Sequence, residues 1–234
     1  MKMDKRLFNK AVIITILIAS FGIFYLPLPG RATCRTNYKN YSATVLSAED
    51  IAIYQALEKE EYKEEIASYN LSVLGFTLGK STFKNVQDKL GTAEYYRNKI
   101  DGESADGEIY YISTAKGDDT VIEFSSGPSG GWEQLDGFII TTSQNLTKEI
   151  NPTPSVIVNR KTSTKSGLRL GLSPKDFERI IGRKPSFKKR DALYYSFHKK
   201  EMEGKDLYDI NSLVVAKFKD GKLIFLMITK TKFS

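Results

Sequence analysis

Short apolar stretches rich in aromatic and β-branched residues dominate the pattern of the chain after residue 90. One group lies at 94–96, 109–112, 121–124 and 138–141, and a second lies at 193–197, 213–218 and 223–228. Such stretches are typical of β-strands. In the stretch that ends near Phe218, apolar residues at 214, 216 and 218 alternate with Val215, Lys217 and Lys219, which is typical of a strand with one buried and one wet face. Asp220-Gly221, between the last two stretches, is a preferred sequence for a tight hairpin turn. The pattern therefore predicts two groups of antiparallel strands.

A short motif precedes each group of strands. Leu78-Gly79-Lys80-Ser81 recurs as Leu170-Gly171-Leu172-Ser173, with one extra residue before the next glycine in the first copy. In each copy the serine suits a helix N-cap, an apolar stripe follows, and Gly91 or Gly182 suits the helix end. We therefore predict an α+β fold of two tandem modules, residues 71–142 and 167–234. Each module is expected to be a short helix pair packed on an antiparallel sheet of three or four strands.

Two further segments complete the predicted organisation. Ser47 to Asp50 resembles a capping box, and apolar residues then recur at helical spacing. This predicts a tether and an amphipathic helix within residues 35–70, with the helix ending near Asn70. Residues 143–166 are rich in Ser, Thr, Asn and Pro. They predict a linker that holds a short strand at 156–158.

The first 34 residues have the pattern of an export segment. Several basic residues between Lys2 and Lys10 precede an uncharged, mostly apolar run from Ala11 to Leu28. Such a segment is typical of a secretory signal peptide or of an uncleaved membrane anchor. The run is long for the first and short for the second, so cleavage and anchoring both stay open. Either outcome predicts that the rest of the chain lies on the periplasmic or extracellular side of a membrane.

The Leu-Gly-x-Ser motif, the apolar stripe, the glycine and the strand meander together resemble a known architecture. They are similar to the modules of the SmpA/OmlA outer-membrane assembly lipoproteins and to the tandem repeats of the beta-lactamase inhibitor protein. The similarity covers the chain from Leu71 to its C-terminus. It implies helices laid on an antiparallel sheet and used to bind other proteins outside the cytoplasm. Cys34 lacks the sequence context of a lipoprotein signal, and no binding residue transfers from these families.

Residue types that carry catalysis or hold metals are sparse. The chain has one cysteine and one histidine, so an internal disulfide and a cysteine metal cage are excluded. His198 lies beside two lysines, and its sequence neighbours do not identify a catalytic partner. A set of acidic residues lacks the spacing of a calcium loop and favours solvated turns, namely Asp101, Glu103, Asp106, Glu108, Asp118 and Asp119. We expect no cofactor and no metal, and a non-catalytic protein; the alternative is an envelope hydrolase with an unidentified site.

Charge is divided unevenly along a chain whose net charge is +7. Residues 35–150 carry 11 Lys and Arg against 19 Asp and Glu, whereas residues 151–234 carry 19 against 8. A basic stretch follows the second predicted helix and consists of Arg183, Lys184, Lys188, Lys189 and Arg190. Three interpretations stay open for it: a solvated loop, a contact with an anionic membrane or polysaccharide, and pairing with the acidic half, within a molecule or by self-association. The export segment argues against nucleic acid as a partner.

The loop from Ser125 to Trp132 is rich in serine and glycine and carries the only tryptophan. An aromatic residue on such a loop is typical of a binding hot spot, although covering a sheet edge is an equal alternative. Trp132 and the basic stretch are therefore the candidate binding residues. The sequence as a whole predicts an exported envelope protein that binds another envelope protein or an anionic surface.

Overall fold

The computed structural model describes residues 47–57, 65–98, 106–127 and 133–233. These residues belong to one compact unit, Tyr38–Ser234. The predicted export segment, most of the tether and Trp132 lie outside the described residues. Within the described ranges, no helix is long and apolar enough to cross a membrane.

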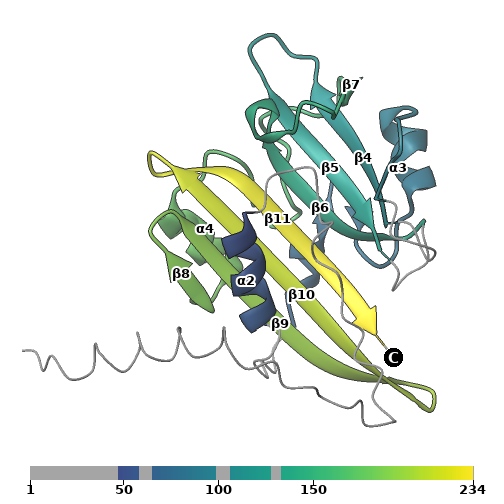
Figure 1. Cartoon of the computed structure of the whole chain (residues 1–234), viewed down its shortest axis with the longest axis vertical. Helices are drawn as coiled ribbons and strands as arrows, with labels where there is room; N and C mark the ends of the chain where they lie inside the picture. The colour runs from purple at the N-terminus through teal and green to yellow at the C-terminus, as the bar shows by residue number, and fades with distance from the viewer. Residues whose placement is uncertain (1–46, 58–64, 99–105, 128–132, 234) are drawn as a thin grey trace, which may run out of the picture. The chain divides into compact units, whose positions relative to one another are not determined.

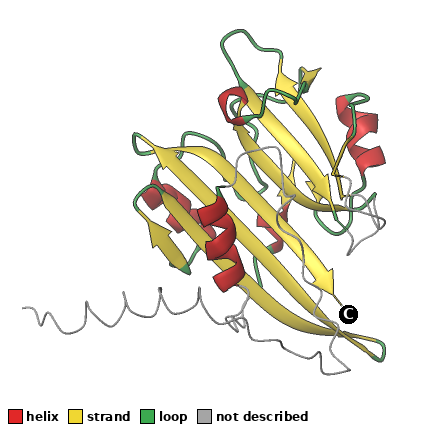
Figure 2. Cartoon of the chain, viewed as in Figure 1, coloured by secondary structure: helices red, strands yellow, loops and turns green. Residues whose placement is uncertain are grey.

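One large sheet runs through this unit, beside a small two-stranded one (Figures 1 and 2). Eight strands follow one another in the order β3-β4-β5-β6-β11-β10-β9-β8, each antiparallel to its neighbour, and β7 pairs in parallel with β4. The strands are β3 (Tyr96–Asn98), β4 (Asp106–Ser113), β5 (Thr120–Ser126), β6 (Leu135–Thr142), β7 (Thr153–Ser155), β8 (Phe187–Lys189), β9 (Ala192–Glu203), β10 (Asp206–Lys219) and β11 (Lys222–Phe233). Asp220 and Gly221 have the positive φ angles that the predicted hairpin turn requires.

The continuous sheet contradicts the predicted pair of separate modules. Strands β6 and β11 pair over Gly137–Ile140 and Leu226–Thr229, so the two expected sheets are one. Among the described residues, each half carries one short α-helix, α3 (Phe83–Leu90) or α4 (Pro174–Ile181), rather than a helix pair. The physical reason is that β6 and β11 would each present an unpaired row of backbone groups in separate modules.

The two short helices begin and end at polar caps and glycines. Ser173 accepts a hydrogen bond from the Asp176 N–H and Gly182 ends α4, both as predicted. In α3 the predicted cap Ser81 is wrong, because Thr82 forms a capping box with Asn85. The extra residue in the first copy of the motif is thereby explained, since the cap lies one position later.

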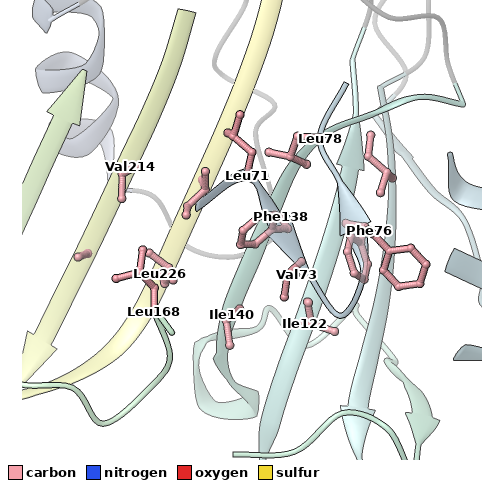
Figure 3. Packing of buried hydrophobic residues seen from close by; sticks show 14 of the residues in the cluster. Leu71, Val73, Phe76, Leu78, Ile122, Phe138, Ile140, Leu168, Val214 and Leu226 are labelled. Carbon is pink, nitrogen blue, oxygen red and sulfur yellow. The ribbon is translucent and has the colours of Figure 1, made fainter. Parts of the chain in front are cut away.

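The main core lies on one face of the sheet. Both α3 and α4 pack there, together with the 3₁₀ helix η2 (Ser68–Leu71) and the small hairpin of β1 (Ser72–Val73) and β2 (Phe76–Thr77). Figure 3 shows side chains from both halves of the sheet meeting in this core, among them Phe138 and Leu226. The core therefore continues without a break across the β6–β11 seam. A second 3₁₀ helix, η4 (Ser143–Asn145), follows β6.

Helix α2 (Ala48–Leu57) packs on the opposite face of the sheet, in front of β9 and β10 in Figure 1. Leu57 contributes to a second buried cluster that includes Val215 and Met227. The prediction of a wet face here is wrong, since Val215 is 2% exposed. The helix is also shorter than predicted, because residues 65–67 are not helical and Asn70 lies in η2.

Candidate binding sites

The predicted basic stretch is mostly engaged within the protein. Strand β8 places Lys188 and Lys189 at the sheet edge, so the prediction of a loop is wrong for these two residues. Lys188 lies 3.6 Å from Glu178, and Lys189 lies 2.6 Å from Glu49 of α2. The Arg183 guanidinium lies over the Phe197 ring, 4.7 Å from its centroid.

The other two basic residues of the stretch differ from these three. Lys184 and Arg190 are exposed, and neither forms an ion pair with any residue in the described part of the chain. They are therefore the members of the stretch that remain available to an anionic partner.

Helix α2 is attached to the sheet through a buried carboxylate. Asp50 is 5% exposed and accepts hydrogen bonds from Lys217 (2.6 Å) and from the Tyr194 hydroxyl. Ser47 and Asp50 also form the predicted capping box, with reciprocal backbone-to-side-chain bonds of 2.8 and 3.2 Å. Burial opposes ionisation of Asp50, but these hydrogen bonds outweigh it and lower the pKa of the carboxyl from 3.8 to about 2.

A second group of carboxylates is buried in the other half of the sheet. Glu108 and Glu123 are 5% and 2% exposed, and the Tyr110 hydroxyl donates a hydrogen bond to Glu108. Burial and the charges of the two glutamates raise the pKa of Tyr110. The prediction that Glu108 belongs to a solvated turn is wrong, because it lies on β4. Asp101 and Glu103 fall outside the described residues.

The single histidine makes one specific contact. His198 Nε2 lies 3.2 Å from Asp209 Oδ1, across the β9–β10 pair. This carboxylate was not identified from the sequence, because it is eleven residues away and becomes a neighbour only through strand pairing. Among the described residues, no group of three or more His, Cys, Asp and Glu residues is placed to hold a metal.

Two exposed large apolar residues lie at one end of the sheet. Pairing between β6 and β11 ends at Thr229, whereas β10 and β11 remain paired as far as Asp209 and Phe233. The β9–β10 pair continues to Glu203 and Asp206, so this hairpin extends beyond the end of its neighbours (Figure 1). We call Glu201–Tyr208 the hairpin tip.

Two apolar side chains lie opposite each other on the hairpin tip. Met202 is 62% exposed and Leu207 is 52% exposed, and the two are direct cross-strand partners. The neighbouring strand supports the tip, because Lys232 contacts Glu203 and lies 4.1 Å from the centroid of the Tyr208 ring. A cavity of about 230 Å³ borders the same region and is lined by residues that include Glu201, Ile210, Lys230 and Lys232.

No family model, no curated protein and no solved structure matches this chain. The resemblance to the SmpA/OmlA lipoproteins and to the beta-lactamase inhibitor protein therefore stays a prediction. The hairpin tip was missed in the sequence, although Gly204 marks a turn there and Met202 and Leu207 interrupt a charged stretch. Single apolar residues in a polar segment do not reveal whether they are buried until strand pairing is known.

Proposed function

We propose that this chain is an exported, non-catalytic binding protein whose hairpin tip captures another protein of the cell envelope. The observation that carries the proposal is the exposed Met202–Leu207 pair on a supported hairpin. The N-terminal basic and apolar segment supports the location, because it has the pattern that directs chains to or across a membrane. In this proposal the segment keeps the binding unit at the membrane or releases it outside.

The energetics of the tip suit capture of a protein surface. Full burial of a side chain such as Met or Leu stabilises a complex by roughly 1.5–3 kcal/mol. The two side chains sit on paired strands, and Lys232 holds the neighbouring Glu203 and Tyr208. Such a supported hairpin loses little conformational entropy on binding, so more of the burial energy remains as affinity. A partner with an apolar pocket and a polar rim fits this surface.

The test is site-specific photo-crosslinking of the full chain in the cells that produce it. A photoreactive residue at Met202 should yield a discrete crosslinked product, and a second substitution, Leu207→Ser, should abolish it. Val156 provides the matched control, because it is 84% exposed but has no apolar partner across a strand. The proposal fails if position 156 yields the same product, or if the product survives Leu207→Ser.

The His198–Asp209 contact favours a second candidate, an envelope hydrolase. A carboxylate that orients an imidazole is one part of a catalytic triad, although a nucleophile is also required. Ester hydrolysis by the purified chain tests this candidate, with p-nitrophenyl acetate as the substrate. Activity that His198→Gln removes, while the thermal transition is unchanged, would favour the hydrolase. Activity equal to that of free imidazole at the same concentration would reject it.

A further inference from the structure

Two loops meet beside the end of β4. One is the turn between β4 and β5, and the other follows β7. Between them lies a cavity of about 500 Å³. Its lining residues are Ala115, Lys116, Asp118, Asn159, Arg160 and Lys161. Its volume falls within the range of small-ligand sites, roughly 300–1,000 Å³, although it is a shallow cavity that is widely open to solvent.

A buried carboxylate locks the two loops together. The Asp118 side chain is 5% exposed and accepts hydrogen bonds from the Thr120 hydroxyl (2.6 Å) and the Arg160 N–H (2.7 Å). In return, Arg160 Nη2 donates to the Gly117 carbonyl at 2.8 Å. Burial opposes ionisation of Asp118, but these hydrogen bonds lower the pKa of its carboxyl below the ordinary value. The cavity walls are therefore positioned before any ligand arrives.

The second loop also stabilises its own conformation. The Asn159 side chain accepts a hydrogen bond from the Lys161 N–H at 2.9 Å and donates one to the Ile157 carbonyl at 3.0 Å. These bonds fix the backbone that carries Arg160 and Lys161. Arg160 and Lys161 thereby line the same cavity as Lys116 of the other loop.

The charges of the lining do not cancel. Three cations, Lys116, Arg160 and Lys161, accompany one carboxylate, which already accepts several hydrogen bonds. Arg160 Nε lies 4.0 Å from Asp118. Lys116 and Lys161 are exposed and have no ion-pair partner among the residues that the structure describes. An anion placed between these two lysines would gain attraction from both and would reduce their mutual repulsion.

We propose that this cavity is a binding site for an anionic oxygen group, phosphate or carboxylate, carried by a polar molecule such as an acidic sugar or a lipid headgroup. Lys116 and Lys161 bind the anion as point charges, and Arg160 chiefly positions the loop. The site lies apart from the predicted basic stretch and from the hairpin tip. It adds a small-ligand function to the proposed capture of a protein.

The test uses the full chain in a neutral detergent, titrated calorimetrically at low salt with three probes. Glucose 6-phosphate and inorganic phosphate should bind, and glucose should not. The double substitution Lys116→Gln and Lys161→Gln should weaken binding of glucose 6-phosphate at least tenfold. Arg160 is left unchanged because its guanidinium helps to hold the turn. An unchanged thermal transition would confirm that the variant is folded.

The matched control removes the same charge elsewhere. Lys219 and Lys222 are exposed cross-strand partners beside the Asp220-Gly221 turn. Their replacement by Gln should leave the affinity for glucose 6-phosphate within twofold. Equal losses in the two double variants would show only diffuse attraction and would overturn the proposal. An absence of binding by both phosphate-containing probes would overturn it as well.

Two competition arms identify the source of the anion. Polygalacturonate represents an acidic polysaccharide, and vesicles of phosphatidylglycerol represent an anionic membrane, with phosphatidylcholine vesicles as the neutral reference. Competition by one of them against glucose 6-phosphate assigns the site to that source, and competition by neither assigns it to a small soluble anion. The variant Leu207→Ser should bind all of these anions normally. Failure of the proposed anion site can therefore be distinguished from failure of the proposed protein capture.

Discussion

Replacing Asp50 with asparagine tests how α2 is held on the sheet. Asparagine keeps a side-chain oxygen that can accept the Ser47 N–H, so the helix cap is retained. The change removes the negative charge that Lys217 contacts at 2.6 Å within a site where Asp50 is 5% exposed. If Asp50→Asn lowers the free energy of unfolding by more than the loss of an exposed ion pair does, the excess therefore measures the contribution of the buried charge.

The expected magnitude follows from the pKa of Asp50, which is about 2 in the folded chain and 3.8 in the reference state. Each pKa unit corresponds to about 1.4 kcal/mol, so the ionised carboxyl stabilises the folded state by about 2 kcal/mol at pH 7. Because the folded-state pKa is lowered, this contribution is fully present well above pH 4 and is lost as the pH falls toward 2. At pH 3 about 1 kcal/mol should remain.

The measurement is urea unfolding of residues 38–234, the compact unit, at pH 7 and at pH 3. Glu49→Gln serves as the control, because the Glu49 and Lys189 side chains are 63% and 38% exposed and an exposed pair contributes at most about 1 kcal/mol. Adding Lys217→Met to Asp50→Asn should restore part of the lost stability, since the cation that Asp50 neutralises is then removed as well. A loss no larger than that of Glu49→Gln, or one that is the same at both pH values, would refute the reasoning.

Three further results are expected. Gly137→Ala should destabilise the chain by about 1–3 kcal/mol in urea unfolding, because an added Cβ would clash with the Ser125 hydroxyl at the seam of the sheet. Thr82→Ala should cost about 1 kcal/mol through the lost helix cap, and an undiminished thermal transition would contradict the assignment of that cap. Replacing Lys184 and Arg190 with glutamate should reduce binding to phosphatidylglycerol vesicles without lowering the thermal transition; unchanged binding would leave the basic stretch without an anionic partner.

The strands and the short helices were accessible to sequence analysis because they depend on local patterns. Short apolar stretches rich in aromatic and β-branched residues predicted most of β4, β5, β6, β9, β10 and β11, and Asp220-Gly221 predicted the hairpin. The predicted strand at 156–158 is displaced, since β7 occupies Thr153–Ser155 beside β4. Partners of this kind depend on distant parts of the chain, and a single sequence does not reveal them.

The candidate sites were less accessible for the same reason. The basic stretch was visible as composition, but its partners Glu178 and Glu49 belong to two different helices. The anion-binding lysines Lys116 and Lys161 lie far apart in the sequence and share a cavity only because Asp118 joins their loops. Composition therefore identified where charge is abundant, whereas the fold determines which charges remain available.

The β6–β11 seam also governs when the fold can be completed during synthesis. Strand β11 is the final strand described, and its partner β6 is made long before it, as Leu226 opposite Ile140 illustrates. Until β11 emerges, the apolar strand β6 keeps an open edge, the kind of surface that favours aggregation of incomplete chains. A chain that ends before Lys222 would retain the first four strands of the series but lose the strand that closes them. Escort of the nascent chain should therefore matter until β11 has emerged.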